Sequence, residues 1–269
     1  MKIVVVIPTY NERQNIPQLV ERLLALPLDL DLCFVDDGSP DQTGRLLESM
    51  QVMQPRLRVF HRPGKLGIGT AYRQAFRMLL REPYDRYIAM DADLSHPPEC
   101  IPHLLEATND ADLVIGSRYV NDGGTLNCAA HRKLLSRTAN QLTRLMLGVA
   151  VRDATAGFRC YRRELLSTLD QIAIRSNGYS FQIEVTYVTQ ALGYRVREVP
   201  IIFRDRVYAR SKLGTSEILG AAQTLFRLGV RHVIGKACPS RRGKFDPNSG
   251  TETNALEQQK YPQDLMHII

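Results

Sequence analysis

Two acidic residues separated by a single alanine, Asp91 and Asp93, are the side chains of this sequence best suited to chemistry. A short apolar run over residues 87–90 leads directly into them, and the Pro–Pro pair that follows cannot continue a strand, so the pattern predicts a strand that ends where the acids begin. Two carboxylates at this spacing can hold a hard divalent cation, which takes its other ligands from water and substrate phosphates. Such pairs also cap helices and line ordinary turns, so the interpretation depends on the rest of the chain.

Four further apolar runs, over residues 3–7, 30–35, 57–60 and 113–115, also end at polar residues. Helical patterns follow most of them, and alternating strands and helices predict a mainly parallel sheet with right-handed crossovers. In such a sheet the carboxyl ends of the strands lie along one edge, which is where ligands bind. We therefore expect one crevice to contain the charged residues that follow the five strands: Glu12, Asp37, Lys65, Asp91, Asp93 and Arg118.

A glycine-rich segment, residues 64–69, precedes a predicted helix over residues 70–80. It lacks the G-x-x-x-x-G-K-[ST] pattern of a P-loop and the third glycine of the dinucleotide-binding fingerprint. Two interpretations remain open. Either the glycines only allow a tight turn, or the turn places Lys65 beside a phosphate.

The composition bounds the class of protein. The chain has 269 residues, 44% of them hydrophobic and 23% charged, which is typical of one large or two small globular domains. The N-terminal apolar run meets Pro8 too early for a signal peptide, and no stretch reaches the roughly 20 apolar residues of a membrane-spanning helix, so we expect a cytoplasmic protein. The five cysteines lack a C-x-x-C spacing, which disfavours a disulfide framework and a zinc site.

Positive charge is concentrated between Arg195 and Lys244, where twelve Lys or Arg residues accompany three acidic ones, against a net charge of +7 for the whole chain. An anionic partner would explain this excess, and a solvated basic surface without a partner is the alternative. A nucleic-acid or anionic-membrane binding module would account for the basic segment. It would leave the acids of the predicted crevice without a purpose, because they would repel phosphates.

The second half of the chain is less regular, and its clearest predicted elements are a strand over residues 195–203 and a helix over residues 216–234. The helix has apolar side chains on one side, with Arg227 and Arg231 on another, a pattern typical of a helix lying among membrane headgroups. An ordinary amphipathic helix that covers the sheet is the alternative.

Seven short motifs occur in the order seen in dolichyl-phosphate mannosyltransferases. They are Pro8-Thr9-Tyr10-Asn11-Glu12, Val35-Asp36-Asp37-Gly38-Ser39-Pro40-Asp41, Lys65-Leu66-Gly67, Met90-Asp91-Ala92-Asp93-Leu94-Ser95-His96, Gly116-Ser117-Arg118-Tyr119, Gly157-Phe158-Arg159, and Arg206-Val207-Tyr208 with Ser211-Lys212-Leu213-Gly214. The chain resembles this polyprenyl-phosphate mannosyltransferase family from about residue 3 to about residue 232. The resemblance implies an α/β fold, a single Rossmann-like glycosyltransferase domain of type A with a mainly parallel sheet.

The resemblance also implies a division of the chain. The glycosyltransferase domain would cover residues 1–235, as a nucleotide-sugar-binding half (1–118), an acceptor half (119–215) and an amphipathic interfacial helix (216–235), followed by a flexible tail (236–269).

Roles for individual side chains follow from the same resemblance. The nucleotide sugar would be bound by Pro8, Tyr10, Glu12, Val35, Asp37, Lys65, Ala92, Arg206 and Lys212. A Mg2+ or Mn2+ ion would be held by Asp91, Asp93 and Ser95, the last of which is Gln in some relatives. The acceptor phosphate would be bound by Arg118, Arg132 and Ser136. Asp91, Asp93 and Arg118 are the residues with predicted catalytic roles.

The reaction implied by the resemblance is inverting transfer of a sugar to a polyprenyl or dolichyl phosphate, with mannose from GDP-mannose as the expected sugar and donor. A phosphate monoester with a second pKa of about 6 arrives largely ionised, so no general base is required and His96 is expected only to pack against the strand end. UDP-glucose or another nucleotide sugar is the alternative donor, since no motif identifies the sugar. A processive polysaccharide synthase is disfavoured, because it carries a Gln-x-x-Arg-Trp element and this chain has no Trp.

Two expectations concern the membrane and the basic segment. Membrane contact should be peripheral, on the cytosolic face, through the C-terminal helix or through an anchoring partner subunit. Arg206, Arg210 and Lys212 crowd three cations into one short segment, with Asp205 as the expected partner of Arg206. Their mutual repulsion predicts a mobile loop that closes over the donor diphosphate.

Overall fold

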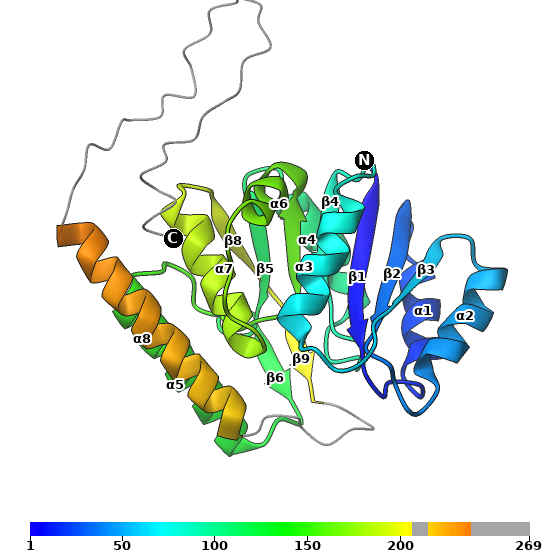
Figure 1. Cartoon of the computed structure of the whole chain (residues 1–269), viewed down its shortest axis with the longest axis horizontal. Coiled ribbons are helices and arrows are strands. Elements are labelled where there is room, and N and C mark those ends of the chain that lie inside the picture. Colours follow the sequence, from blue (N-terminus) through cyan, green and yellow to red (C-terminus); the bar gives the residue numbers. More distant parts are fainter. Residues whose placement is uncertain (206–214, 238–269) are drawn as a thin grey trace, which may run out of the picture.

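The computed structural model describes residues 1–205 and 215–237, apart from the side chains of residues 179, 215–219 and 234–237. In this part of the chain, helices cover both faces of a seven-stranded sheet, and a second sheet has two strands (Figure 1). The strand order is β3-β2-β1-β4-β7-β5-β8 in the large sheet and β6-β9 in the small one. The predicted segment Arg206 to Lys212 and the predicted tail from residue 238 onward lie outside the described residues.

The strands of the large sheet run in one direction except for β7, which is antiparallel to β4 and to β5. The mainly parallel α/β sheet expected from the sequence is therefore confirmed. The strands are β1 (Ile3–Thr9), β2 (Leu30–Asp36), β3 (Leu57–His61), β4 (Arg86–Ala89), β5 (Leu113–Ser117), β6 (Gly124–Leu126), β7 (Arg159–Arg162), β8 (Val196–Pro200) and β9 (Ile202–Arg204).

The helices connect the strands and form two layers. They are α1 (Ile16–Leu24), α2 (Thr43–Met53), α3 (Ile68–Leu79), a short 3-10 turn η1 (Pro98–Cys100), α4 (Ile101–Ala107), α5 (Ala130–Leu147), α6 (Arg163–Asp170), α7 (Tyr179–Ala191) and α8 (Thr215–Ala237). Side chains of α3, α6 and α7 belong to one buried cluster, and those of α1, α2 and α4 to another. Helices α5 and α8 pack against each other beyond α7 (Figure 1).

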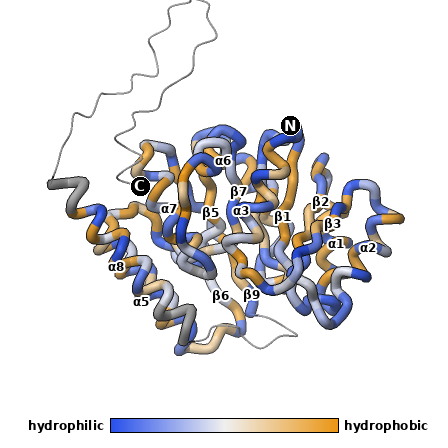
Figure 2. Tube along the Cα trace, viewed as in Figure 1, coloured by the Kyte–Doolittle hydropathy of each residue, from blue (hydrophilic) through white to orange (hydrophobic). Residues whose placement is uncertain are grey.

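Strand β1 shows why the sheet is covered on both faces. Its side chains alternate, so that Val4 and Val6 join the α3-side cluster while Ile3, Val5 and Ile7 join the α1-side cluster. All five are buried, so β1 is apolar from Ile3 to Ile7, as expected for a parallel strand between two helical layers. Figure 2 shows the same concentration of hydrophobic residues along the central strands.

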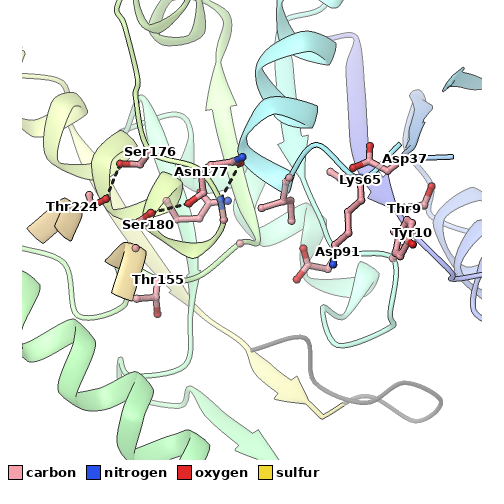
Figure 3. A pocket seen from close by; sticks show the side chains of 18 of the residues that line it. Thr9, Tyr10, Asp37, Lys65, Asp91, Thr155, Ser176, Asn177, Ser180 and Thr224 are labelled. Carbon is pink, nitrogen blue, oxygen red and sulfur yellow. Dashed lines mark hydrogen bonds between the residues drawn. The ribbon is translucent and has the colours of Figure 1, made fainter. Parts of the chain in front are cut away.

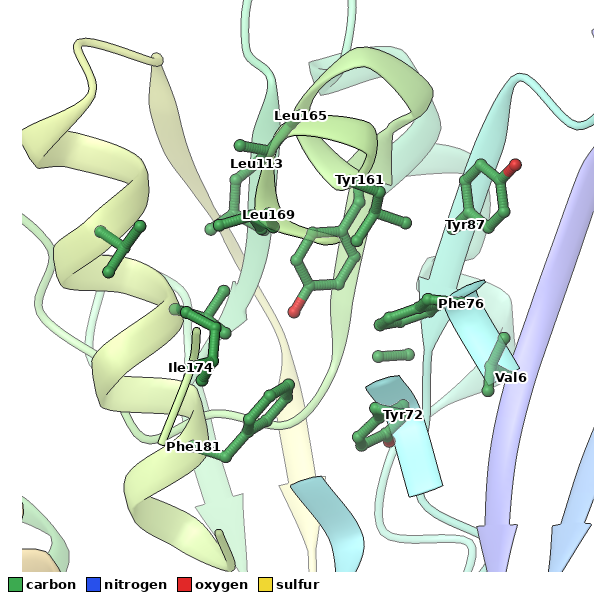
Figure 4. Close-up of a cluster of buried hydrophobic side chains, with 14 of the residues drawn as sticks. Val6, Tyr72, Phe76, Tyr87, Leu113, Tyr161, Leu165, Leu169, Ile174 and Phe181 are labelled. Carbon is green, nitrogen blue, oxygen red and sulfur yellow. The ribbon is translucent and has the colours of Figure 1, made fainter. Parts of the chain in front are cut away.

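An aromatic cluster on the α3 side fixes the helices that border the ligand edge (Figure 4). Tyr72 stacks between Phe76 and Phe181, with ring centroids 5.7 and 6.2 Å apart. Phe76 in turn meets the edge of Tyr161 on β7, at 5.5 Å. The Tyr72 hydroxyl donates to the carbonyl of Met90 at 3.3 Å, so α3 and α7 are tied to the end of β4.

The predicted strand over residues 195–203 is divided in two by the tertiary structure. At Ile201 the N–H donates to the carbonyl of Ser117 in β5, whereas the carbonyl accepts from Gly124 in β6. The chain thus leaves the large sheet after Pro200 and enters the small one. The predicted C-terminal helix is present as α8, and among the described residues no helix has the length and apolar character needed to cross a membrane.

Candidate active site

A cavity of about 730 Å3 lies at the carboxyl ends of the parallel strands. Tyr10 and Asp37, which follow β1 and β2, form one end of it, and Ser180 and Thr224, from α7 and α8, form the other (Figure 3). Asp91, which follows β4, lies between the two ends (Figure 3). Both halves of the chain therefore contribute to one site at the edge where a parallel sheet binds ligands.

The turn that carries the two acids is strained and tightly held. Leu94 has a φ of +63°, a conformation that a bulky residue rarely adopts and that often marks a functional turn. The buried Asp93 accepts a hydrogen bond from the backbone N–H of Ser95 at 3.1 Å. His96 is also buried, stacks on a buried phenylalanine ring, and accepts from the backbone N–H of Asp91 through Nδ1 at 3.1 Å. As expected, His96 packs against the strand end, where it positions Asp91.

The residues of this turn suit a hard divalent cation. Asp91 and Asp93 offer carboxylate oxygens, the ligands that such ions prefer. The Oγ atom of Ser95 is buried and has no hydrogen-bond partner, so it can serve as a third oxygen ligand, directly or through water. Within the described residues, no cluster of three or more His, Cys, Asp or Glu side chains could hold a metal on its own. The donor set fits an ion that takes several ligands from substrate phosphates.

Asp37 forms a buried ion pair that the sequence did not indicate. Its two carboxylate oxygens accept from Nε and Nη2 of Arg62 at 2.6 and 2.7 Å. Arg62 also donates to the Thr70 hydroxyl at 2.8 Å and to the carbonyl of Gly67 at 3.2 Å. The pair fixes the orientation of the Asp37 carboxylate in the cavity wall, and the oxygens keep lone pairs for a ligand.

The glycine-rich segment approaches the second half of the chain very closely. Gly67 has a φ of +93°, and a Cβ there would come within 2.3 Å of the Asn177 side chain. Asn177 Oδ1 accepts from the N–H of Gly69 at 3.0 Å, which holds the two loops together over the cavity. Lys65 lines the same cavity, with Nζ 5.3 Å from the centre of the Tyr10 ring. The tight turn is thus real, and the role of Lys65 at a phosphate stays a prediction.

Arg227 corrects one expectation about the C-terminal helix. The helical pattern placed its side chain among membrane headgroups, but the guanidinium turns inward and donates to both oxygens of the buried Glu184, at 3.0 and 3.1 Å. Glu184 also accepts from the N–H of Ser176 at 2.7 Å. Burial alone raises the pKa of Glu184, but the bonds from Arg227 and Ser176 outweigh it and hold the pKa below its usual value. The buried Glu184 carboxylate requires a cation as partner, and this requirement turns the Arg227 side chain inward.

Arg118 forms a second buried pair beside the cavity. Its Nε and Nη2 each donate to a carboxylate oxygen of Asp153 at 2.7 Å, and Nη2 also donates to the Thr155 hydroxyl at 2.9 Å. Asp153 is fully buried. Burial alone raises the pKa of its carboxyl, but the charge and hydrogen bonds of Arg118 outweigh it, so the pKa lies below the usual value. Asn140 on α5 joins the group through a 3.0 Å bond to Thr155.

The other two predicted acceptor residues lie on the same helix as Asn140. Arg132 and Ser136 precede it at four-residue intervals on α5, so the three share one helical face. Arg132 donates to both carboxylate oxygens of Asp205, at 2.6 and 2.7 Å, a partner that the sequence did not indicate. The Oγ atom of Ser136 is buried and has no hydrogen-bond partner.

The predicted site residues therefore fall into three groups. Those that line the cavity are Pro8, Tyr10, Glu12, Asp37, Lys65, Asp91, Ala92 and Asp93. Those that do not line it are Val35, Ser95, Arg118, Arg132 and Ser136. The remaining two, Arg206 and Lys212, lie outside the described residues.

Arg118 does not share the wall of the crevice with the acids, contrary to expectation, because the buried Asp153 holds its guanidinium. Val35 is a buried core residue. The cavity and the Arg118 cluster still meet at Thr155, because Thr155 lines the cavity and its hydroxyl accepts a hydrogen bond from Arg118. Residues of the site that the sequence did not indicate include Arg62, Asp153, Arg175, Asn177 and Gln182. No local motif marks them, since each is defined by what it meets in the folded chain.

Comparison with known proteins identifies relatives over most of the chain. Residues 4–170 match the family described as glycosyl transferase family 2. A polyprenol monophosphomannose synthase of Mycolicibacterium smegmatis is 44% identical over 235 residues, which are 87% of this chain and 89% of the relative. An undecaprenyl-phosphate mannosyltransferase of Micrococcus luteus is 42% identical over 230 residues, 86% of this chain and 95% of the relative.

Solved structures with low sequence identity share the fold. A glucosyl-3-phosphoglycerate synthase from Mycobacterium tuberculosis in complex with phosphoglyceric acid superimposes with a TM-score of 0.61 at 20% identity, covering 86% of this chain and 79% of that one. A mannosyltransferase from Pyrobaculum calidifontis in complex with GDP-Man and Mn2+ gives a TM-score of 0.52 at 15% identity, covering 89% and 76%.

Proposed function

The chain belongs to glycosyl transferase family 2 and is a glycosyltransferase, and from this we propose that it transfers mannose from GDP-mannose to a polyprenyl phosphate with inversion at the anomeric carbon. The resemblance of its motifs to polyprenyl-phosphate mannosyltransferases agrees with the names of the two relatives that are more than 40% identical. One observation of the site supports the proposal most directly. Thr155 lies at the junction of an acid-lined cavity, suited to a donor, and an arginine cluster, suited to a lipid phosphate.

The donor would occupy the cavity. Its nucleoside would lie against Tyr10 and Asp37, and its diphosphate near Lys65 and the Asp91 turn. There Asp91, Asp93 and Ser95 would hold Mg2+ or Mn2+. When bound, such an ion neutralises the charge that develops on the departing diphosphate. The side chains of this turn are positioned beforehand by His96 and by the strained backbone, so they need little rearrangement.

The acceptor would be held by the cluster around α5. Arg118, Arg132 and Ser136 bind the lipid phosphate and direct one of its oxygens toward the anomeric carbon. That oxygen forms the new C–O bond while the bond to the donor diphosphate breaks and its electron pair leaves with the diphosphate. The phosphate is ionised at neutral pH, so no side chain has to remove a proton.

A transfer assay tests this proposal. Radiolabelled GDP-mannose and UDP-glucose are each incubated with polyprenyl phosphate, with Mn2+ or with a chelator, and label is measured in the lipid phase. We expect label from GDP-mannose only, and only with the divalent cation present. Lipid label from UDP-glucose but none from GDP-mannose would refute the assigned donor, and full transfer in chelator would refute the assigned metal.

Membrane contact is the remaining part of the proposed function. The phosphate lies at the end of a lipid, so the α5 side of the site must reach a bilayer. Helices α5 and α8 pack side by side and carry large apolar side chains that are exposed to solvent. These are Leu134, Leu142, Leu145, Phe226, Val230 and Val233. We call this set the α5–α8 apolar surface, and in Figure 2 both helices show orange segments at the rim of the molecule. It replaces Arg227 as the proposed membrane contact.

Vesicle sedimentation tests the α5–α8 apolar surface. Replacing Phe226, Val230 and Val233 together by Ser should reduce binding to phospholipid vesicles by more than tenfold, because about 0.8 kcal/mol is lost for each methylene group that no longer inserts and the three changes remove several. The matched control replaces Val52 and Met53 by Ser. These two residues are even more exposed than the three on α8, but they lie on α2. If the triple variant and the control sediment alike, α8 does not contact lipid and anchoring by a partner subunit is favoured.

A further inference from the structure

Gln182 lines the cavity and has a buried polar atom without a partner. It is the fourth residue of α7, only 4% exposed, and its Oε1 has no hydrogen-bond partner. Asp91 lines the same cavity. A buried acceptor without a donor destabilises a folded protein, and such atoms persist where a ligand supplies the missing bond. Nothing in the reaction described above uses this atom.

The position of Gln182 is fixed relative to the Asp91 turn. Its neighbour Phe181 stacks on Tyr72 at 6.2 Å, and the Tyr72 hydroxyl binds the carbonyl of Met90 directly before Asp91. A side chain on a helix fixed in this way can discriminate between ligands that differ by one hydroxyl, because the helix does not move with the ligand.

The loop opposite Gln182 is fixed as well. The fully buried Arg159 donates to the carbonyls of Ala154 and Ala156, both at 2.7 Å, and to Thr186 at 3.0 Å, one turn after Gln182 on α7. This holds the 154–157 loop against α7. Gly157 ends the loop beside Asp91, since a Cβ there would lie 3.5 Å from the Asp91 carboxylate. Gln182 thus borders the space next to the acids on the side away from the nucleoside end.

The chemistry of this wall suits a sugar. The half of the cavity to which Gln182 belongs has uncharged lining residues that both donate and accept, namely Thr155, Ser180, Gln223 and Thr224. It also has Arg175 and Arg227, and the guanidinium of Arg227 is bonded to Glu184. A carbonyl oxygen such as Oε1 can only accept, so a phosphate oxygen is repelled there, whereas a hydroxyl can donate to it. The nucleoside is placed at the opposite end, by Tyr10 and Asp37. The ribose and the hexose of a nucleotide sugar both adjoin the diphosphate and carry hydroxyl groups. The ribose belongs with the nucleoside at the Tyr10 and Asp37 end, so the hexose is the part that lies toward Gln182.

We infer that Gln182 is a specificity-determining residue, whose Oε1 accepts a hydrogen bond from one hydroxyl of the hexose that is transferred. This inference rests on the proposed function, because it assumes a nucleotide sugar in the cavity. It supplies what the sequence motifs lack, a side chain that can distinguish one hexose from another. A site that pairs with a hydroxyl rejects the analogue without that group strongly, because its own polar atom is then left buried and unpaired.

The test compares nucleotide-sugar binding with nucleotide binding. In Gln182→Met, which keeps the shape but removes the acceptor, affinity for GDP-mannose with Mn2+ should fall about 10- to 100-fold by calorimetry, while affinity for GDP with Mn2+ stays unchanged. The melting temperature should not fall, because the lost atom had no partner in the folded protein. A panel of monodeoxy GDP-mannoses should contain one that binds wild type weakly and that Gln182→Met no longer distinguishes from GDP-mannose.

Gln190→Met is the matched control. Gln190 lies on the same helix, and its Oε1 is already occupied by the N–H of Ala150 at 3.2 Å. This variant should lose stability and keep its preference for GDP-mannose over GDP. Equal losses of GDP-mannose and GDP affinity in Gln182→Met, or no loss of either, would overturn the inference. If wild type transfers no mannose yet binds another nucleotide sugar, the proposed function fails, and the same comparison is made with that sugar nucleotide and its parent nucleotide.

Discussion

Replacing Asp93 by Asn is expected to reduce sugar transfer roughly 100- to 1000-fold, the loss typical of a removed electrostatic contact to the leaving group, while the protein stays folded. Asp93 is buried, and within the turn it accepts a hydrogen bond from the N–H of Ser95. An Asn side chain keeps an oxygen for that bond. It removes the negative charge that a divalent cation requires, so the change acts on the chemistry and not on the turn.

The measurement has two parts. Transfer is assayed under saturating donor and lipid, and Mn2+-dependent affinity for GDP is measured without transfer, so that a loss of cation binding is seen directly. Asp91→Asn should behave similarly. Asp110→Asn is the control: Asp110 is exposed and precedes β5, away from the carboxyl ends of the strands, so this variant should match wild type in both assays. Near-normal transfer by Asp93→Asn, or cation-independent GDP affinity in wild type, would remove Asp93 from the metal site.

Replacing Arg118 by Ala is expected to have the largest effect on stability, about 3–5 kcal/mol, because it leaves the fully buried Asp153 carboxylate without its cation. Transfer should also fall, since the same guanidinium is proposed to bind the lipid phosphate. Arg132→Ala should raise KM for polyprenyl phosphate as well, but with a smaller loss of stability than Arg118→Ala, because its partner Asp205 is partly exposed whereas Asp153 is fully buried.

A double variant separates the two roles of Arg118. Adding Asp153→Asn to Arg118→Ala removes the unpaired charge and keeps one oxygen, which can accept from the backbone N–H of residue 118. The Thr155 hydroxyl can rotate to accept from the new amide N–H, so urea unfolding should show that much of the stability returns. Transfer should not return with it. Recovery of transfer in the double variant would mean that Arg118 acts only as a structural partner of Asp153.

The sequence by itself determined the parts of this protein that depend on local pattern. Apolar runs that end at polar residues identify strands, and the helical repeats between them require crossovers that place every strand end on one edge. The acids after β1, β2 and β4 were therefore expected together, and Glu12, Asp37, Asp91 and Asp93 do line one cavity. The family could be inferred from motifs at these same positions, because the ligand edge is where motif residues lie.

Only the tertiary structure decided how each charged side chain is used. Arg227 looked like a membrane contact on its own helix, but Glu184, 43 residues away in the sequence, draws it inward. Arg118 was expected in the crevice, but Asp153, 35 residues away, holds it beside the wall. Asp37 is paired with Arg62, which is 25 residues away in the sequence. The periodicity of a helix or strand predicts the face on which a side chain lies. It does not predict which distant helix or strand packs against that face.

Gln182 is another residue whose role only the tertiary structure shows. Its place in the sequence is that of any glutamine near the start of a helix. Its importance comes from burial without a partner, and this depends on Phe181, Tyr72 and Arg159 fixing α7 against the end of β4. The free energy of a polar group is set by the donors and acceptors within about 3 Å of it, and those are chosen by packing between elements far apart in the chain.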